Sequence, residues 1–100
     1  MKNYTISIWL NDKDSKQQEI NTLDAYKIAT NLIIKYFWGW TINEGKGVYT
    51  HDDWTIVIEN TLICSICTSD SIENFIKDAK AVFNQESLMI QEIISKVTFE

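Results

Sequence analysis

The sequence predicts an α+β domain of the ferredoxin-like type, a four-stranded antiparallel sheet with both helices on one face. Three observations favour this fold. The chain has 100 residues, the size of one domain. Its apolar residues alternate with period two in four segments and recur with helical spacing in two others. The segments follow the order strand, helix, strand, strand, helix, strand, which right-handed crossovers fold into a βαββαβ sandwich.

The first predicted strand covers residues 4–10, where every second residue from Tyr4 to Leu10 is apolar. Residues 11–20 are polar and charged, and they predict a solvated loop. The acidic residues of this loop do not fit an EF-hand, because Leu23 stands where the last calcium-binding Glu would be.

The first helix is predicted over residues 22–37, because apolar residues recur there at helical spacing. Thr22 is expected to be its N-cap, and Asp24 places a negative charge in the first turn. Gly39 is expected to end this helix in the left-handed conformation.

The second strand covers residues 40–50 and is interrupted at 45–47, Gly-Lys-Gly. Glycines inside a strand indicate a bulge, which we expect here, or a close backbone approach. Their spacing does not match a phosphate-binding loop. Residues 51–53, His-Asp-Asp, predict a hairpin turn. The third strand follows over 54–68, with one apolar face that only Asn60 breaks.

The second helix is predicted over residues 71–84 and has the most regular helical spacing in the chain. Asp70, with a glutamate three positions on, resembles a capping box, and Asn84 is expected to end the helix. Residues 87–94 predict the last strand, which residues 97–99 extend or follow with a short further piece.

The charge of the chain disfavours several classes of function. There are 14 acidic and 9 basic residues, a net charge of -5, and every basic residue is Lys. A chain without Arg is a poor reader of DNA, and its negative charge disfavours nucleic acid and anionic membranes. The sequence has neither an apolar stretch of membrane-spanning length nor a signal peptide, so we expect a cytoplasmic protein. The charge suits a basic protein partner.

Two groups of residues could carry chemistry. Cys64 and Cys67 have the CxxC spacing of zinc and redox sites, but residues three apart on a strand point to opposite faces, so we expect structural cysteines. His51 beside Asp52 and Asp53 could form an acid–base or metal site, yet an exposed turn is expected because no nucleophile or second base is apparent. We therefore expect no catalytic, cofactor or metal site and no enzyme activity.

The sheet face away from the helices is expected to be open and too apolar for a solvated face. We expect this face to support a dimer or trimer, because Trp is a frequent interface anchor and the chain has four. The alternative is a monomer whose hairpin bends over its own sheet. The candidate interface residues are Trp9, Tyr49, Trp54, Val57 and Ile63.

The layout from Gly39 to Glu92 is similar to that of P-II-like signalling proteins. The shared features are Gly39-Trp40-Thr41-Ile42, Gly45-Lys46-Gly47-Val48-Tyr49, a hairpin, Thr61-Leu62-Ile63-Cys64-Ser65-Ile66, a capped helix, and Phe83-Asn84-Gln85-Glu86-Ser87 before a last strand. The resemblance implies a ferredoxin-like trimer with ligands between subunits. The glycine-rich segment of that family's nucleotide site is missing from residues 93–100, so no ligand residues carry over.

Residues 4–14 and the Lys-only, Ile- and Asn-rich composition resemble small proteins of phages and mobile elements from low-GC Gram-positive bacteria. This resemblance implies an accessory role. Two functions stay open at this point. The first is a non-enzymatic protein that binds and inhibits a host defence protein. The alternative is a P-II-like oligomeric sensor or sponge for a small molecule or nucleotide.

Overall fold

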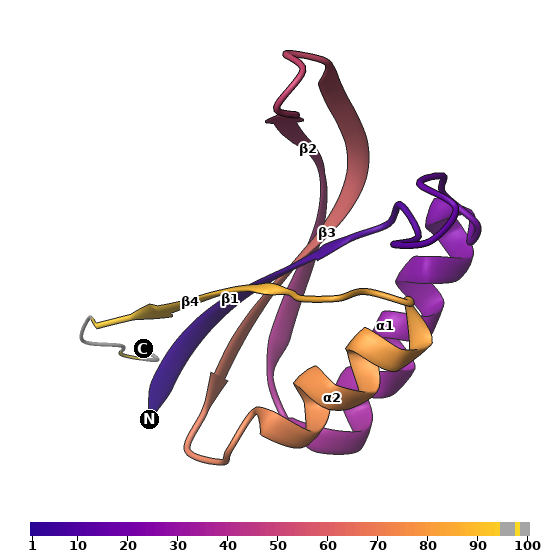
Figure 1. The fold of residues 1–100 in the computed structure, drawn as a ribbon. Coiled ribbons are helices and arrows are strands. Elements are labelled where there is room, and N and C mark those ends of the chain that lie inside the picture. The colour runs from indigo at the N-terminus through magenta and orange to yellow at the C-terminus, as the bar shows by residue number, and fades with distance from the viewer. Residues whose placement is uncertain (95–97, 99–100) are drawn as a thin grey trace.

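A computed structural model describes residues 1–94 and 98 of the chain. Its elements are β1 (Lys2–Trp9), α1 (Thr22–Tyr36), β2 (Trp40–Thr50), β3 (Ile56–Thr68), α2 (Glu73–Val82) and β4 (Met89–Ile93). The four strands pair antiparallel in the order β2-β3-β1-β4. Both helices lie on one side of the sheet (Figure 1). This is the predicted ferredoxin-like βαββαβ sandwich.

The buried core lies between the sheet and the two helices. Apolar residues of β1 and β3 alternate with period two, so one face of each strand packs against the apolar stripes of α1 and α2. Phe37 and Phe75 meet edge to face in this core, with ring centroids 5.4 Å apart. The fully buried large side chains are Phe75, Ile6, Ile8, Ile33, Leu62, Ile66 and Cys64.

The ends of α1 differ from the sequence prediction. The N-cap is Asn21, not Thr22, because the Asn21 side chain accepts a hydrogen bond from the Asp24 N–H at 2.9 Å. The helix stops at Phe37, whose φ of -134° is extended, so the chain leaves without a left-handed residue. The predicted role of Gly39 is therefore wrong: it has no positive φ.

Helix α2 ends as predicted but begins differently. The expected capping box at Asp70 is wrong, because the N-cap is Ile72, whose side chain cannot accept a hydrogen bond; the Glu73 N–H donates to Ser71 Oγ at 3.2 Å instead. At the other end Asn84 adopts a left-handed φ of 47°. The following Gln85 N–H then donates to the Lys80 carbonyl at 2.8 Å, which closes the helix.

Strand β2 runs unbroken through its two central glycines. Its register against β3 never slips, from Trp40–Ile66 to Thr50–Ile56, so the expected bulge is wrong. The other reading of the glycines, a close approach, holds. A Cβ atom at Gly47 would lie 3.1 Å from Trp9 Cδ1.

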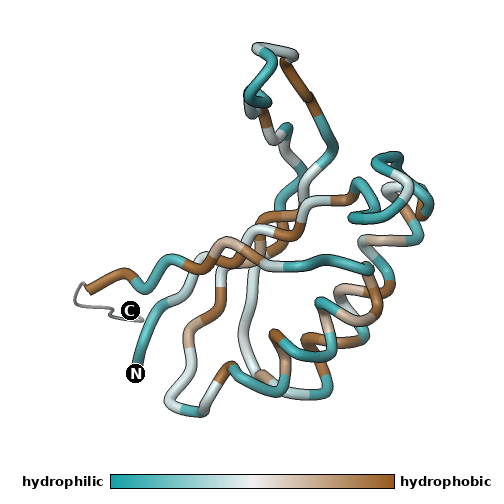
Figure 2. Tube along the Cα trace, in the orientation of Figure 1, coloured by the Kyte–Doolittle hydropathy of each residue, from teal (hydrophilic) through white to brown (hydrophobic). Residues whose placement is uncertain are grey.

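The β2–β3 hairpin projects beyond the rest of the sheet (Figure 1). Pairing between β1 and β3 ends at Trp9 and Thr61, whereas β2 and β3 stay paired as far as Ile56. The projecting part is therefore a two-stranded ribbon, and Figure 2 shows hydrophobic positions along it. Trp54 was expected to begin β3, but it lies in the turn with a φ of 68° and is 85% exposed.

Strand β4 forms one edge of the sheet and is shorter than the predicted 87–94. The further piece expected at 97–99 includes Val97 and Phe99, which lie outside the described residues. Among the residues that are described, no helix is long and apolar enough to cross a membrane.

Candidate functional site

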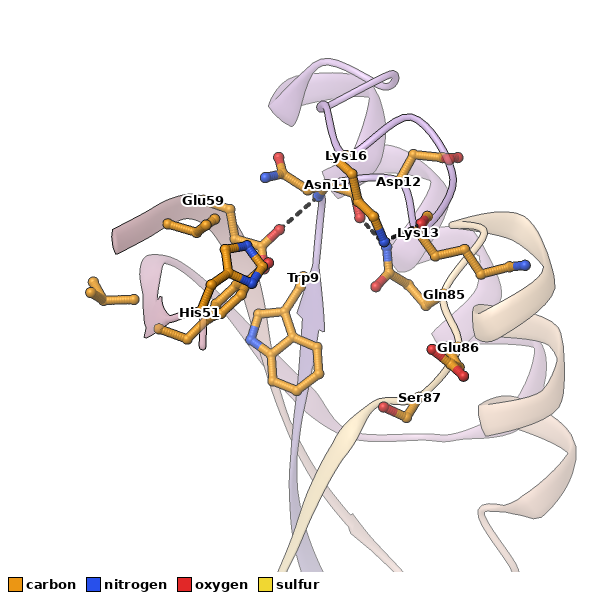
Figure 3. Close-up of a pocket in the computed structure, with 13 residues that line it drawn as sticks. Trp9, Asn11, Asp12, Lys13, Lys16, His51, Glu59, Gln85, Glu86 and Ser87 are labelled. Atoms are coloured by element: carbon orange, nitrogen blue, oxygen red, sulfur yellow. Dashed lines mark hydrogen bonds between the residues drawn. The ribbon is translucent and has the colours of Figure 1, made fainter. Parts of the chain in front are cut away.

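A cavity of about 430 Å³ lies on the open face of the sheet, where the hairpin projects. Three parts of the chain line it: the end of β1 with the loop after it, the β2–β3 hairpin, and the segment after α2. In Figure 3, Glu59 and His51 stand on one side, Gln85, Glu86 and Ser87 stand on the other, and Trp9 lies between them. Its volume is within the range of small-molecule sites, ~300–1,000 Å³.

Glu59 is the buried acid of this cavity. It is the one charged residue of β3, and it is 7% exposed. Because β1 ends at Trp9, the N–H of Asn11 is free of the sheet and donates to Glu59 Oε2 at 2.9 Å. Burial raises the pKa of Glu59, while the Asn11 hydrogen bond opposes that shift. A carboxylate in this position can hold a cationic group of a ligand.

Aromatic side chains stand around Glu59. Gly47 is the β2 partner of Glu59 and has no side chain, so the indole of Trp9 lies against that position. Tyr49 and His51 meet edge to face with ring centroids 5.2 Å apart, and both line the cavity. Flat rings beside a carboxylate suit a ligand with a planar base and a positive charge.

The loop after β1 is an ordered wall of the cavity. The Asp12 carboxylate accepts hydrogen bonds from the N–H groups of Asp14 and Ser15 at 2.8 and 3.0 Å. Asn84, at the end of α2, donates to the same carboxylate at 2.7 Å, and this bond is the main cause that lowers the pKa of Asp12. Gln85 Nε2 donates to the Asn11 carbonyl at 2.7 Å. The segment expected as a merely solvated loop is thus tied to α2.

The structure brings three of the five candidate interface residues together. Trp9, Tyr49 and Val57 all line the cavity. Ile63 is on the same sheet face but lies outside the cavity, with its Cδ1 atom 3.2 Å from where a Gly45 Cβ would be. Trp54 is exposed in the hairpin turn and does not line the cavity.

Of the histidine and the two cysteines that the sequence singled out, only the histidine lies at the cavity. His51 lines the cavity, whereas Asp52 and Asp53 do not, and the Asp53 carboxylate accepts a hydrogen bond from the N–H of the nearby Thr55. Cys64 is buried in the core, and desolvation raises the pKa of its thiol to about 12. Cys67 is on the opposite face of β3, as the strand alternation predicted.

Sequence reasoning missed the polar residues that define the cavity, above all Asn11, Lys16 and Glu59. They lie far apart in the sequence, so no short motif contains them. One signal was available: Glu59 is a single charge within a long apolar strand. Within residues 1–94 and 98, no group of three His, Cys, Asp or Glu side chains is placed to hold a metal ion.

A second hollow of about 620 Å³ lies at the opposite end of the sheet. Trp38, Trp40 and Cys67 line it, but no Asp, Glu, Lys or His side chain does. It is larger than the first cavity, yet it offers no charged side chain to orient a ligand. The cavity around Glu59 is therefore the stronger candidate site.

No protein-family model and no curated protein matches the chain at the level of sequence. The fold, however, is similar to that of a phage SAM lyase in complex with S-methyl-5′-thioadenosine, with a TM-score of 0.67 and 19% identity. That superposition covers 92% of this chain and 79% of the lyase chain. A phage SAM lyase in the apo state gives a TM-score of 0.62 and 20% identity, over 91% and 79% of the two chains.

These neighbours contradict the expected function. The sequence led us to expect a protein without enzyme activity that inhibits a host protein or senses a small molecule, whereas both neighbours are lyases. The expectation failed because it relied on motifs of nearby residues, and this cavity is assembled by the fold. Both neighbours are phage proteins, the kind of source that the sequence resemblance implied. A relationship to P-II-like proteins is not shown.

Proposed function

We propose that this protein binds S-adenosylmethionine (SAM) and cleaves it to S-methyl-5′-thioadenosine. The observation that carries the proposal is the buried carboxylate of Glu59 in an aromatic cavity, on a fold like that of a SAM lyase. SAM combines a planar base with a sulfonium cation. These are the two features that aromatic rings and a carboxylate recognise.

The proposed reaction breaks the bond between the sulfonium sulfur and the four-carbon amino-acid chain of SAM. The electron pair of that bond stays on sulfur, which becomes the neutral thioether of S-methyl-5′-thioadenosine. The carbon that loses sulfur forms a new bond to the ligand's own carboxylate oxygen, or its neighbouring carbon gives a proton to a base and a double bond forms. Both routes balance in atoms and charge.

In this proposal Glu59 binds the sulfonium, and Trp9 and Tyr49 hold the flat base. The attraction between the carboxylate and the cation is strong because Glu59 is 7% exposed, and a bound cation in turn favours the ionised carboxylate. The thioether product is uncharged, so this attraction ends when the bond breaks. Loss of the attraction favours release of the product.

The test is to incubate the protein with SAM and to measure S-methyl-5′-thioadenosine by chromatography. Wild-type protein should form the product. The Glu59→Gln variant should lose about thirtyfold or more in kcat/KM, because removing one partner of a desolvated charge pair costs ~2 kcal/mol or more. The Gln side chain keeps the size of Glu and can still accept the Asn11 hydrogen bond.

Glu44→Gln is the matched control, because Glu44 lies in β2 but does not line the cavity. It should cleave SAM as the wild type does, and circular dichroism should show that both variants fold. No product from the wild type would refute the proposed function. Full activity in Glu59→Gln would refute the role of Glu59.

We also propose that the protein self-associates through the projecting part of the hairpin, with a second copy as the partner. Ile56 and Ile58 lie on its helix-side face and are 65% and 64% exposed, and Val48, the β2 partner of Ile58, is 63% exposed at the rim of the cavity. A two-stranded ribbon is marginally stable alone, and an apolar patch of this kind favours an interface. This face replaces the open face that we expected from the sequence, since three of those residues line the cavity.

A further inference from the structure

Lys16 places an ammonium group at the cavity on a constrained stretch of backbone. Its φ is 63°, in the left-handed region that residues other than glycine rarely adopt. Its Nζ atom donates to the Lys13 carbonyl at 2.6 Å. Figure 3 shows the side chain running from the loop toward the cavity, next to Asn11 and Gln85. Unusual backbone conformations of this kind gather at functional sites.

The loop holds Lys16 in this conformation from several directions. The Lys16 N–H donates to the Asp12 carbonyl at 2.9 Å, and the Asp12 N–H donates to the Gln17 carbonyl at 2.8 Å. Asn84 binds the side chains of both Asp12 and Asp14, at 2.7 and 2.9 Å. The backbone from which the Lys16 side chain extends is therefore set in place before a ligand arrives, which lowers the entropic cost of binding.

The charge of Lys16 is also available to a ligand. The neighbouring Lys13 pairs with Asp14 at 3.6 Å, whereas within residues 1–94 and 98 Lys16 forms no salt bridge. A lysine ammonium has three donors, and the Lys13 carbonyl accepts from one of them. The chain has no Arg, and of the two lysines that line the cavity Lys13 is paired with Asp14, so Lys16 is the cationic side chain best placed to meet a carboxylate that enters it.

We propose that Lys16 forms an anion subsite that binds the carboxylate of an α-amino-acid group on the ligand. This inference rests on the proposed function, because SAM carries such a group and S-methyl-5′-thioadenosine does not. The cavity then has two recognition points. Glu59 takes the cation beside the adenosine part, and Lys16 takes the carboxylate at the other end.

The contribution of Lys16 can be measured with two thioether ligands that the proposed reaction does not consume. S-adenosylhomocysteine has the amino-acid group, and S-methyl-5′-thioadenosine lacks it. Calorimetric titration of Lys16→Gln should show about fivefold or greater loss of affinity for S-adenosylhomocysteine and no change for S-methyl-5′-thioadenosine. Gln must adopt the same left-handed φ of 63° as Lys, so the substitution adds no new backbone strain. If it nevertheless disturbed the fold, the affinity for both ligands should fall by the same factor. Lys27→Gln, on an exposed position of α1, is the control and should change neither affinity.

The outcomes distinguish the two proposals. If the wild-type protein does not cleave SAM, the proposed function fails and the subsite fails with it. If it cleaves SAM but binds S-adenosylhomocysteine no better than S-methyl-5′-thioadenosine, the subsite alone is refuted. If the wild type binds both and Lys16→Gln binds both equally well, the subsite alone is refuted. An equal loss for both ligands also refutes it, since the carboxylate would then play no part. Added salt should weaken the wild-type preference for S-adenosylhomocysteine, because the pair is partly open to water.

Discussion

Glu59 shows how a single residue can lower stability while preparing a site. The residue is 7% exposed, and within residues 1–94 and 98 its carboxylate accepts one hydrogen bond, from Asn11, so the ionised form is poorly compensated in the free protein. A cationic ligand would supply the missing partner. Residues that strain the free protein in this way are expected where binding occurs.

A pH prediction follows from Glu59. Its folded-state pKa is raised above the ordinary 4.5, so the folded protein keeps this proton to higher pH than the unfolded chain does. The stabilising contribution of this group is therefore full below the unfolded pKa and is lost as pH rises through the folded pKa. Urea unfolding should find Glu59→Gln more stable than wild type at about pH 7, with a smaller difference near pH 4. An unchanged difference between the two pH values would contradict this cause.

Gly47 supports the position of Trp9. A Cβ atom there would lie 2.9 Å from Thr61 Oγ1 and 3.1 Å from Trp9 Cδ1, so Gly47→Ala must shift the Thr61 hydroxyl and press on the indole. We expect a loss of ~1–2 kcal/mol, seen as a Tm about 4–8 °C lower per kcal/mol, together with weaker binding of S-methyl-5′-thioadenosine. Gly39→Ala is the control, because nothing lies within 4 Å of its added Cβ. Equal Tm values for the two variants would show that Trp9 does not need this space.

At the scale of elements, Asn84 joins the end of α2 to the loop after β1. It combines a left-handed backbone with two side-chain hydrogen bonds, to Asp12 and Asp14. The two roles can be separated by substitution. Glycine preserves the backbone conformation and removes the two side-chain bonds, whereas alanine removes the same bonds and strains the backbone; the bond from the Lys13 N–H to the Asn84 carbonyl, 3.2 Å, remains in both.

Asn84→Gly should therefore loosen the loop without unfolding α2. Hydrogen exchange followed by mass spectrometry should show faster exchange over residues 11–18 and little change over 73–82. Asn84→Ala should show the same local change and a further loss of stability of ~1 kcal/mol. If exchange over residues 11–18 stays slow in both variants, the loop is held by other contacts.

At the scale of the whole molecule, the projecting hairpin predicts self-association. Light scattering at micromolar concentration should give a mass that is a multiple of 11.6 kDa. Ile58→Lys should return the protein to the monomer with α1 and α2 still folded, because Ile58 is 64% exposed and lies outside the core. Leu23→Lys, a charge at an aliphatic position of α1 that is 62% exposed, should leave the assembly unchanged. A wild-type monomer would refute the assembly.

The sequence by itself determined the elements, their order and the fold class. Apolar residues that recur every two or every 3.6 positions show which face of each strand or helix must be buried. A chain of this length has few ways to bury all of these faces together. The ends of elements were harder to predict, because neighbouring residues compete for them. Asn21 and Thr22 are both good N-caps, and only the bond to Asp24 decides between them.

Only the tertiary structure decided the site. The sheet pairing places Glu59 beside the end of β1, about fifty positions away along the chain, and α2 brings Gln85 against Asn11. The same pairing explains the glycines of β2, since Gly47 makes room for Trp9 from a strand that is not its neighbour. Local patterns encode burial, which depends on adjacent residues, whereas a cavity depends on which distant segments meet.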